Sequence, residues 1–238
     1  MCIRDSFEIT EGGDRSIIYG IRTKDLEISS ASDIFLNGIF ADRALVDNST
    51  NVTLRNIFIS GNNSKYFSSV PGIWNTVTIK LLIRDSPNAN IINSIIRGQT
   101  SIVHQSVAGV RSENIVCENS YFESRITNVN YRNNIHQTSK SNFRASGDLG
   151  GNFEPASSII QGTSYNGHTN SFDSQFRLRP DAAAAGTATD GGDPGPFGGP
   201  DPYRLSGIPE IPIIYGLDAD QFGTTGGGLN VNIRVRAN

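Results

Sequence analysis

The residues best suited to bind a ligand lie between positions 61 and 75, where the sequence contains Tyr66, Phe67 and Trp74. Trp74 is the only tryptophan of the chain. Aromatic rings offer broad apolar faces against which the C–H faces of sugars pack, and loops on a rigid scaffold often carry binding residues. We therefore expect these three residues to bind glycan. The alternative is that Phe67 and Trp74 pin the loop to the scaffold.

Acidic side chains suggest a second kind of chemistry, because glycoside hydrolysis needs two carboxylates roughly 5–10 Å apart. Asp42 with Asp47, or Asp85 with a residue on a neighbouring loop, would meet that distance only if the fold brings them together. No pattern in the sequence requires this arrangement. The sequence therefore assigns no catalytic residues and does not decide whether the chain is an enzyme.

The residues that could bind metal favour other interpretations. His104, His136 and His168 include no pair at the spacing of zinc ligands. Asp190 and Asp193 lie in a glycine-rich stretch, where carboxylates and nearby carbonyls could bind calcium. The alternative is a turn in which each Asp accepts backbone N–H bonds. We favour the turn, and we expect no cofactor.

The elements that must position these residues follow from a ten-residue pattern that occurs five times. Its first position is Asp33, Asn51, Asn88, Asn114 and Asn128, and its sixth is Gly38, Asn56, Asn93, Asn119 and Asn133. Asn and Gly enter the left-handed backbone region at the least cost, so both columns predict a bend in every copy. We also expect the position-six column to form a structural ladder, in which stacked amides hydrogen-bond from copy to copy.

Apolar and polar residues alternate within each copy with the period of two that β-strands have. The apolar columns are position two (Ile34, Val52, Ala89, Ile115 and Val129), position four (Leu36, Leu54, Ile91, Cys117 and Tyr131) and position eight (Phe40, Phe58, Ile95, Tyr121 and Ile135). We predict that all three columns point inward. Such a unit buries its apolar face only by stacking on neighbouring copies at roughly 4.8 Å, which predicts an all-β parallel solenoid.

The spacing of the copies is uneven, because their first positions are 18, 37, 26 and 14 residues apart. A full solenoid coil generally needs about 20 residues or more. We therefore expect the last copy to lie on a different face. In the outward column at position five, Glu118 and Arg132 are predicted to form a surface ion pair.

Composition limits the classes of partner. The net charge is -3 and only 18% of the residues are charged, which argues against nucleic acid, since that partner favours a basic face. No apolar run approaches the roughly 18 residues that span a bilayer. Cys117 fills a predicted inward position, where a free cysteine behaves as a small apolar residue. We expect a monomer.

The order of segments can be predicted as well. Residues 1–6 (MCIRDS) match the translation of ATG TGT ATA AGA GAC AG, the transposon end used to tag sequencing libraries, so we expect an adapter remnant and missing N-terminal coils. We predict a solenoid with an irregular last part over 7–178 and a segment rich in Gly, Pro and Ala over 179–207. Residues 208–238 are predicted to form a β-hairpin, with strands 211–218 and 229–236, that caps the solenoid.

Three stretches resemble secreted bacterial proteins that consist of right-handed parallel β-helix repeats. They are 88–98 (NANIINSIIRG), 176–199 (FRLRPDAAAAGTATDGGDPGPFGG) and 207–238, which ends in LNVNIRVRAN. The family's usual form of the middle stretch is closer to L-K-x-x-S-P-A-x-x-A-G-T-D-G-T-D-I-G-x-x-G-G. Here Ala182 and Ala183 replace Ser-Pro, and Pro194 follows Asp193 where an apolar residue is usual.

This resemblance implies a right-handed parallel β-helix that is secreted or lies on the outer surface of a bacterial cell. Wider relatives of the fold include polysaccharide lyases, glycoside hydrolases and adhesins. Two functions follow as expectations. One is a domain that binds or processes polysaccharide, and the other is a non-catalytic structural or adhesive solenoid.

Overall fold

The computed structural model describes residues 4–61, 79–103, 114–124, 129–137, 147–153, 156, 159–165, 167–204, 213–219 and 231–236. The chain divides into two compact units, Met1–Arg204 and Leu205–Asn238. The predicted glycan-binding residues Tyr66, Phe67 and Trp74 lie outside the described residues, as does His104.

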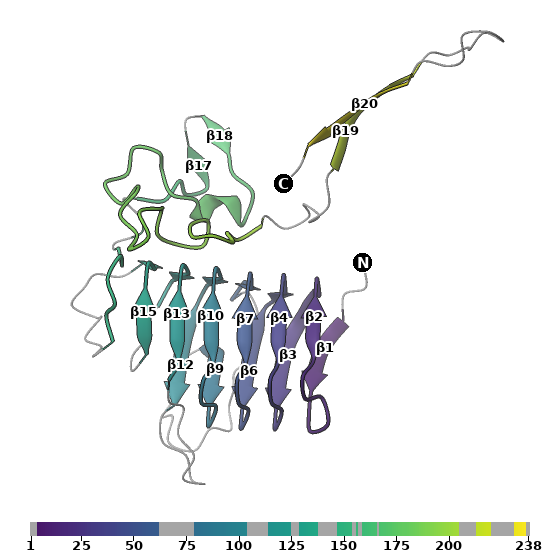
Figure 1. Cartoon of the computed structure of the whole chain (residues 1–238), viewed down its shortest axis with the longest axis vertical. Helices are drawn as coiled ribbons and strands as arrows, with labels where there is room; N and C mark the ends of the chain where they lie inside the picture. Colours follow the sequence, from purple (N-terminus) through teal and green to yellow (C-terminus); the bar gives the residue numbers. More distant parts are fainter. Residues whose placement is uncertain are drawn as a thin grey trace, which may run out of the picture. The chain divides into compact units, whose positions relative to one another are not determined.

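The first unit contains three parallel sheets (Figure 1). Sheet A has the order β1 (Arg4–Ile9), β3 (Thr23–Ser29), β6 (Arg43–Asp47), β9 (Ile79–Arg84), β12 (Gln99–Val103). Sheet B has the order β2 (Ile17–Tyr19), β4 (Phe35–Asn37), β7 (Thr53–Arg55), β10 (Asn90–Ile92), β13 (Val116–Glu118), β15 (Asn130–Arg132). Sheet C has the order β5 (Phe40–Ala41), β8 (Phe58–Ile59), β11 (Ile95–Ile96), β14 (Tyr121–Phe122), β16 (Ile135–His136).

The chain passes through sheets B, C and A in turn, and each pass pairs in parallel with the one before it. The predicted columns stay in register, since Leu36 pairs with Leu54 and Leu54 with Ile91. The described residues contain no α-helix. The protein is therefore all-β, and its three parallel sheets are compatible with a β-solenoid.

The bends predicted from the Asn and Gly columns are confirmed. Every described member of the two columns has a positive φ, between 46° and 70°: Asp33, Asn51, Asn88 and Asn114 at position one, and Gly38, Asn56, Asn93, Asn119 and Asn133 at position six. A third set of left-handed residues follows the strands of sheet A, with φ between 45° and 55°: Ser30, Asn48 and Asp85. The ten-residue pattern did not include this third bend.

Positions two and four point inward as predicted. Their described members are all at most 4% exposed and belong to one apolar cluster inside the three sheets. Position eight does not, and that prediction is wrong. Phe58, Ile95, Tyr121 and Ile135 belong to a second cluster on the opposite face of sheet C. The reason is that positions eight and nine are consecutive strand residues and must face opposite sides, so position nine fills the interior instead.

The last copy lies on the same face as the others, which corrects the expectation drawn from the 14-residue interval. Its strand β15 pairs with β13 in the common register, with Val116 opposite Asn130. The interval from position 114 to position 128 is short because, in the part of the chain that the structure describes, it contains β13 of sheet B and β14 of sheet C but no strand of sheet A.

An amide ladder exists, but it runs along position one rather than position six. Asn51 Nδ2 donates to Asp33 Oδ1 at 2.8 Å, Asn88 Nδ2 to Asn51 Oδ1 at 3.1 Å, and Asn114 Nδ2 to Asn88 Oδ1 at 3.2 Å. The position-six side chains make different bonds. Asn56 Nδ2 donates to Asn37 Oδ1 at 2.9 Å, and the partners of Asn93 and Asn133 belong to the functional site below.

A polar column also runs through the interior at position seven. Ser94 Oγ accepts from Ile57 N at 3.1 Å, Ser120 Oγ accepts from Ser94 N at 3.0 Å, and Asn134 Oδ1 accepts from Ser120 N at 2.9 Å. All three polar side chains are fully buried. Each thus satisfies a backbone N–H of the preceding pass that would otherwise be costly to bury.

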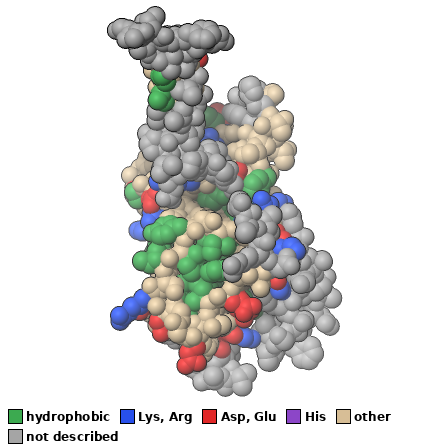
Figure 2. All heavy atoms as spheres, turned by 90° about the vertical axis from the view of Figure 1, so that its right-hand side faces the viewer, with side chains coloured by type: hydrophobic (Ala, Val, Ile, Leu, Met, Phe, Trp, Pro, Cys, Tyr) green, Lys and Arg blue, Asp and Glu red, His purple; other side chains and the backbone are tan. Residues whose placement is uncertain are grey.

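At one end of the stack, β1 and β2 are the terminal strands of sheets A and B. Ile17 and Tyr19 of β2 are 64% and 59% exposed, and Figure 2 shows hydrophobic side chains gathered on this side of the molecule. A strand edge with exposed apolar residues is a template for pairing with another chain. Because β1 begins at Arg4, residues 4–6 of the predicted adapter remnant pair with β3; their origin stays a prediction.

After β16, an irregular segment covers the outer face of sheet C, and we call residues 159–204 the covering segment. It contains a short antiparallel pair, β17 (Ser164–Tyr165) and β18 (His168–Thr169), and one 3-10 turn, η3 (Ser174–Phe176). Its apolar residues complete the second cluster, among them Ile159, Ile160, Phe176, Ala184 and Tyr203. This cover explains why position eight is apolar although it points outward.

The second unit is a hairpin of β19 (Ile213–Ala219) and β20 (Val231–Arg236). The two strands are antiparallel, with Leu217 opposite Ile233, which confirms the predicted pairing. The capping role stays a prediction.

Within the described ranges, no helix has the length and the apolar character that crossing a membrane requires.

Candidate functional site

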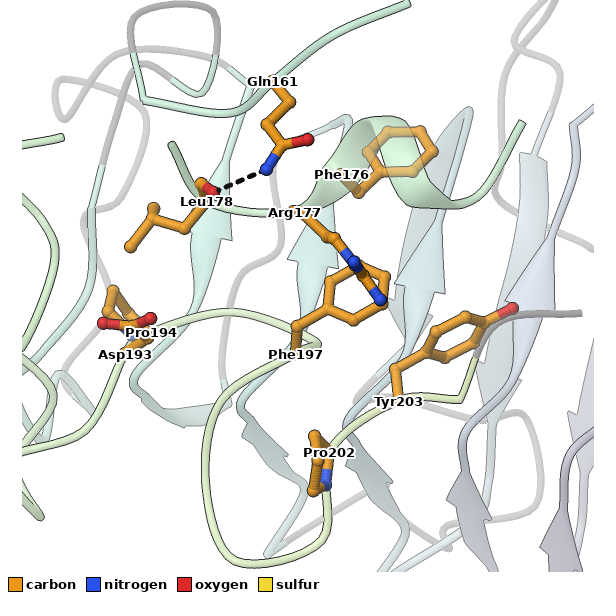
Figure 3. A pocket seen from close by; sticks show the side chains of 9 residues that line it. All are labelled: Gln161, Phe176, Arg177, Leu178, Asp193, Pro194, Phe197, Pro202 and Tyr203. Atoms are coloured by element: carbon orange, nitrogen blue, oxygen red, sulfur yellow. Dashed lines mark hydrogen bonds between the residues drawn. The ribbon is translucent and has the colours of Figure 1, made fainter. Parts of the chain in front are cut away.

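A pocket of about 330 Å³ lies within the covering segment (Figure 3). It is lined by Gln161, Phe176, Arg177, Leu178, Asp193, Pro194, Phe197, Pro202 and Tyr203. The lining combines three aromatic rings with one cation, one carboxylate and one amide. This mixture of apolar faces and few polar groups is typical of small-molecule and sugar sites.

The rear of the pocket is attached to sheet C through Phe176. Its ring lies 4.5 Å from the ring of Tyr121 and 6.1 Å from that of Phe58, centroid to centroid. Next to it, Gln161 N donates to Arg177 O and Arg179 N to Ile159 O, both at 2.8 Å. These bonds pair the chain around 160 with the chain around 178, so the rear wall has a defined backbone.

The aromatic side of the pocket consists of Phe197 and Tyr203, whose rings meet edge to face with centroids 5.5 Å apart. Tyr203 is 5% exposed, and its hydroxyl donates to Asp173 Oδ2 at 3.4 Å. The Arg177 guanidinium carbon lies 5.2 Å from the centroid of Phe197, within the range of a cation–π contact. Arg177 is exposed, so its N–H groups are accessible at the pocket while its charge is held over the ring.

The polar side of the pocket is set by turn geometry. Asp193 Oδ1 accepts from Gly186 N at 2.8 Å, and Asp190 Oδ1 accepts from Gly192 N at 3.0 Å. Both bonds are those of the turn interpretation that the sequence favoured over calcium. Within the described ranges, no three His, Cys, Asp or Glu side chains gather as a metal site. Gln161 Nε2 donates to Leu178 O at 3.2 Å, which orients its amide at the rim.

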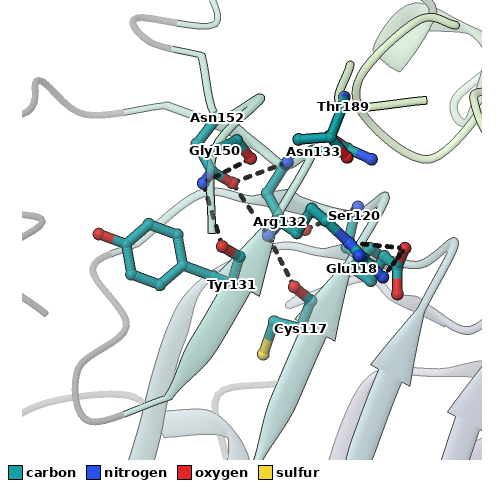
Figure 4. A network of polar contacts seen from close by, with 10 residues as sticks. Cys117, Glu118, Ser120, Tyr131, Arg132, Asn133, Gly150, Asn152 and Thr189 are labelled. Carbon is teal, nitrogen blue, oxygen red and sulfur yellow. Dashed lines mark hydrogen bonds and ion pairs between the residues drawn. The ribbon is translucent and has the colours of Figure 1, made fainter. Parts of the chain in front are cut away.

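The front wall is supplied by residues 189–203, which we call the strap, and the position-six column holds it. Asn93 Nδ2 donates to Gly198 O at 2.8 Å and to Pro196 O at 3.2 Å. Asn133 accepts twice, at its backbone O from Gly195 N (2.7 Å) and at Oδ1 from Thr189 N (2.8 Å). Figure 4 shows Asn133 with Thr189 next to it.

The strap also fits closely against the stack. A Cβ on Gly195 would lie 2.4 Å from Cδ1 of Ile135, and one on Gly199 would lie 2.4 Å from Nδ2 of Asn119. Asp201 forms an ion pair with Arg55 of β7. Small residues and single polar contacts therefore fix the position of this wall, because it has no strand of its own among the described residues.

Of the carboxylates considered for hydrolysis, Asp42 and Asp47 are engaged elsewhere, and Asp85 occupies the left-handed bend after β9, where no described residue hydrogen-bonds its buried Oδ1. Asp47 forms an ion pair with Arg84, and Asp42 accepts a hydrogen bond from Ser60 Oγ. Asp193 is the one carboxylate among the residues that line the pocket. The described residues that line the pocket thus present no carboxylate pair.

Two further sequence predictions have a structural outcome. Glu118 and Arg132 form the predicted ion pair at 2.8 Å, seen in Figure 4, and the hydrogen bond to Glu118 raises the pKa of Arg132. Cys117 and His136 lie inside the stack, where burial raises the pKa of the thiol and lowers that of the imidazole to about 3.

Comparisons with protein-family models, with curated proteins and with solved structures found no match.

The sequence did not predict the pocket, because the pocket residues follow no period and lie in stretches without a strand or helix pattern. One signal was present. Phe197 and Tyr203 are aromatic residues in a segment otherwise rich in Gly, Pro and Ala, where an exposed loop has little need of them.

Proposed function

We propose that this chain is a carbohydrate-binding domain of a right-handed parallel β-helix protein that a bacterium secretes or displays on its surface. The pocket in the covering segment would hold a short stretch of a polysaccharide. The observation that carries this proposal is the pairing of two fixed aromatic rings, Phe197 and Tyr203, with hydrogen-bonding side chains at one pocket.

The physical fit is to the two kinds of surface that a sugar presents. The C–H faces of a pyranose pack on aromatic rings, and its hydroxyls need donors and acceptors in the ring plane. Arg177 supplies donors, Asp193 supplies acceptors, and Gln161 supplies both. The rings of Phe197 and Tyr203 contact each other, so little conformational entropy would be lost on binding.

Binding is favoured over catalysis because one carboxylate lines the pocket where hydrolysis would need two. The second candidate is a non-catalytic structural or adhesive solenoid. It is supported by the continuous position-one ladder from Asp33 to Asn114, which stiffens the stack without any ligand.

The test is affinity electrophoresis of the whole chain in gels that contain one soluble polysaccharide each, from neutral glucans and xylans to acidic pectate and alginate. We expect retardation by at least one polysaccharide, and Phe197→Ala should weaken it about tenfold, the scale of an aromatic contact. The matched control is Tyr19→Ala, because Tyr19 is an exposed aromatic residue on β2.

Three outcomes decide the proposal. Retardation that Phe197→Ala weakens and Tyr19→Ala does not supports it. Equal retardation of all variants excludes the pocket, and Trp74→Ala in the same gels then tests the predicted site of Tyr66, Phe67 and Trp74. Absence of retardation across the panel leaves the structural solenoid as the better interpretation.

A further inference from the structure

The strap provides most of the wall that faces Arg177, yet its own hydrogen bonds are few and local. Gly198 N donates to Gly195 O at 3.0 Å and Tyr203 N to Pro196 O at 2.7 Å, which close two turns around Phe197. These turns shape the strap without attaching it to the stack. Its position must therefore come from contacts with the coils.

Asn93 makes the contact closest to the pocket. Its amide reaches the carbonyls of Pro196 and Gly198, the two residues that flank Phe197. Asn93 is 2% exposed, so both bonds lie away from solvent. One side chain thus fixes the backbone on both sides of the ring that lines the pocket.

Asn133 holds the other end of the strap. Its Oδ1 accepts from Thr189 N and its backbone O accepts from Gly195 N. Asn133 is also 2% exposed. Thr189 and Gly195 lie on either side of Asp193, so the two bonds define where this carboxylate stands in the wall.

The bend alone does not explain why these positions are asparagine. Gly38 makes the same bend in the first copy, with φ of 70°, and glycine adopts this region at lower cost than asparagine does. The side chains of Asn93 and Asn133 therefore have a second role, and the ladder that would explain them runs along position one instead.

We infer that Asn93 and Asn133 are positioning residues for the pocket: they hold the strap so that Phe197 and Asp193 face the ligand, although neither asparagine lines the pocket. This inference rests on the proposed function. It predicts that ligand affinity depends on two side chains buried beneath the wall.

The test uses the double variant Asn93→Gly/Asn133→Gly, which keeps both left-handed bends and removes only the amides. The matched control is Asn88→Gly, because Asn88 has φ of 58° in the same copy as Asn93 and its amide bonds only within the exposed ladder. Two quantities are measured: hydrogen exchange of peptides from 189–203, and retardation by the polysaccharide that binds the parent protein most tightly.

We expect exchange in the strap to accelerate at least tenfold in the double variant, with the coil peptides unchanged, and affinity to fall about tenfold. Asn88→Gly should stay within twofold of the parent in both. Asn93→Asp, which keeps the size of the side chain and sets an acceptor against two carbonyls, should reproduce both losses even if the double variant folds poorly.

Unchanged exchange in the strap would overturn the inference, because the asparagines would then not hold it. Faster exchange with unchanged affinity would overturn it as well, since the wall would not matter for binding. If the parent protein binds no polysaccharide, the proposed function fails, while the exchange measurement still decides whether the asparagines hold the strap.

Discussion

The stacked coils and the covering segment are stabilised in opposite ways. In the coils each contact is repeated from pass to pass: Leu54 lies between Leu36 and Ile91, and Ile91 pairs in the same register with Cys117. In the covering segment each contact occurs once, as with Phe176 on Tyr121 or Asn93 on Gly198. Repetition spreads the loss of stability caused by one substitution over neighbouring passes. In the covering segment, by contrast, the loss of one contact can detach a whole wall of the pocket from the coils.

This difference places the candidate pocket in the irregular part. A repeated surface presents the same groups in every pass, so it offers few ways to bring unlike side chains together. The covering segment brings Gln161, Arg177, Asp193 and Phe197 to one pocket because its backbone is not periodic. The coils supply a rigid face on which this arrangement is fixed.

The largest effect should come from a cavity in the repeated core. Leu54 is 1% exposed, and Leu54→Ala should lower the free energy of unfolding by about 3 kcal/mol and move the transition of the coils as a whole. Phe176→Ala should cost a similar amount but loosen the covering segment first. Urea unfolding followed by hydrogen exchange separates the two, and simultaneous loss of both regions in Phe176→Ala would contradict the comparison.

The next largest effect should be a pH dependence of stability caused by the buried imidazole of His136, at the end of the stack. His136 is 1% exposed and stacks on Phe122 with ring centroids 5.7 Å apart. Burial lowers its pKa to about 3, whereas an unfolded chain binds this proton below about 6.5. The unfolded state thus binds more protons between these two values, so the contribution to stability is present above pH 6.5 and is lost as the pH falls towards 3.

His136→Phe should remove this pH dependence. We expect the unfolding free energy of the parent to fall by about 1.4 kcal/mol per pH unit, relative to the variant, as the pH drops below 6. The measurement is urea unfolding at pH 7, 6, 5 and 4 for both proteins. If the unfolding free energies of parent and variant change with pH in parallel, the imidazole does not titrate between pH 7 and pH 4.

A smaller effect should follow from crowding within the strap. A Cβ on Gly198 would lie 1.7 Å from the carbonyl O of Asp193, so Gly198→Ala must displace the wall at a cost of about 2 kcal/mol. Polysaccharide retardation should be lost while the coils keep their unfolding transition. Gly192→Ala is the control, because its φ is not in the left-handed region and a Cβ there would meet only the end of the Asp190 side chain, at 3.3 Å. Retardation retained by Gly198→Ala would argue against the strap as a wall.

The smallest effect concerns the terminal strand of the coils. Ile17 is 64% exposed on β2, and Ile17→Lys should change stability by less than about 0.5 kcal/mol. It should reduce concentration-dependent association, because a lysine on an edge strand opposes pairing with another chain. Sedimentation velocity at rising concentrations measures this, and equal association of parent and variant would show that the edge is not used.

The sequence by itself determined the bends of the repeated part and two of its inward columns. Asn56, Asn93 and Asn119 marked the bends because few other residues enter the left-handed region, and Leu36, Leu54 and Ile91 marked an inward column because strand side chains alternate. Both features are local, so the order of residues is enough to reveal them. The same reasoning recovered the pairing of β19 with β20.

The tertiary structure decided everything that depends on which surfaces meet. Tyr121 and Ile135 are apolar either because they point inward or because something covers them, and only the covering segment distinguishes the two. Likewise, Asn93 could bond to Asn119 one pass away or to Gly198, 105 residues along the chain. Spacing along the sequence does not reveal which partner Asn93 bonds. An amide donates to whichever carbonyl the packing of distant segments brings within hydrogen-bond distance.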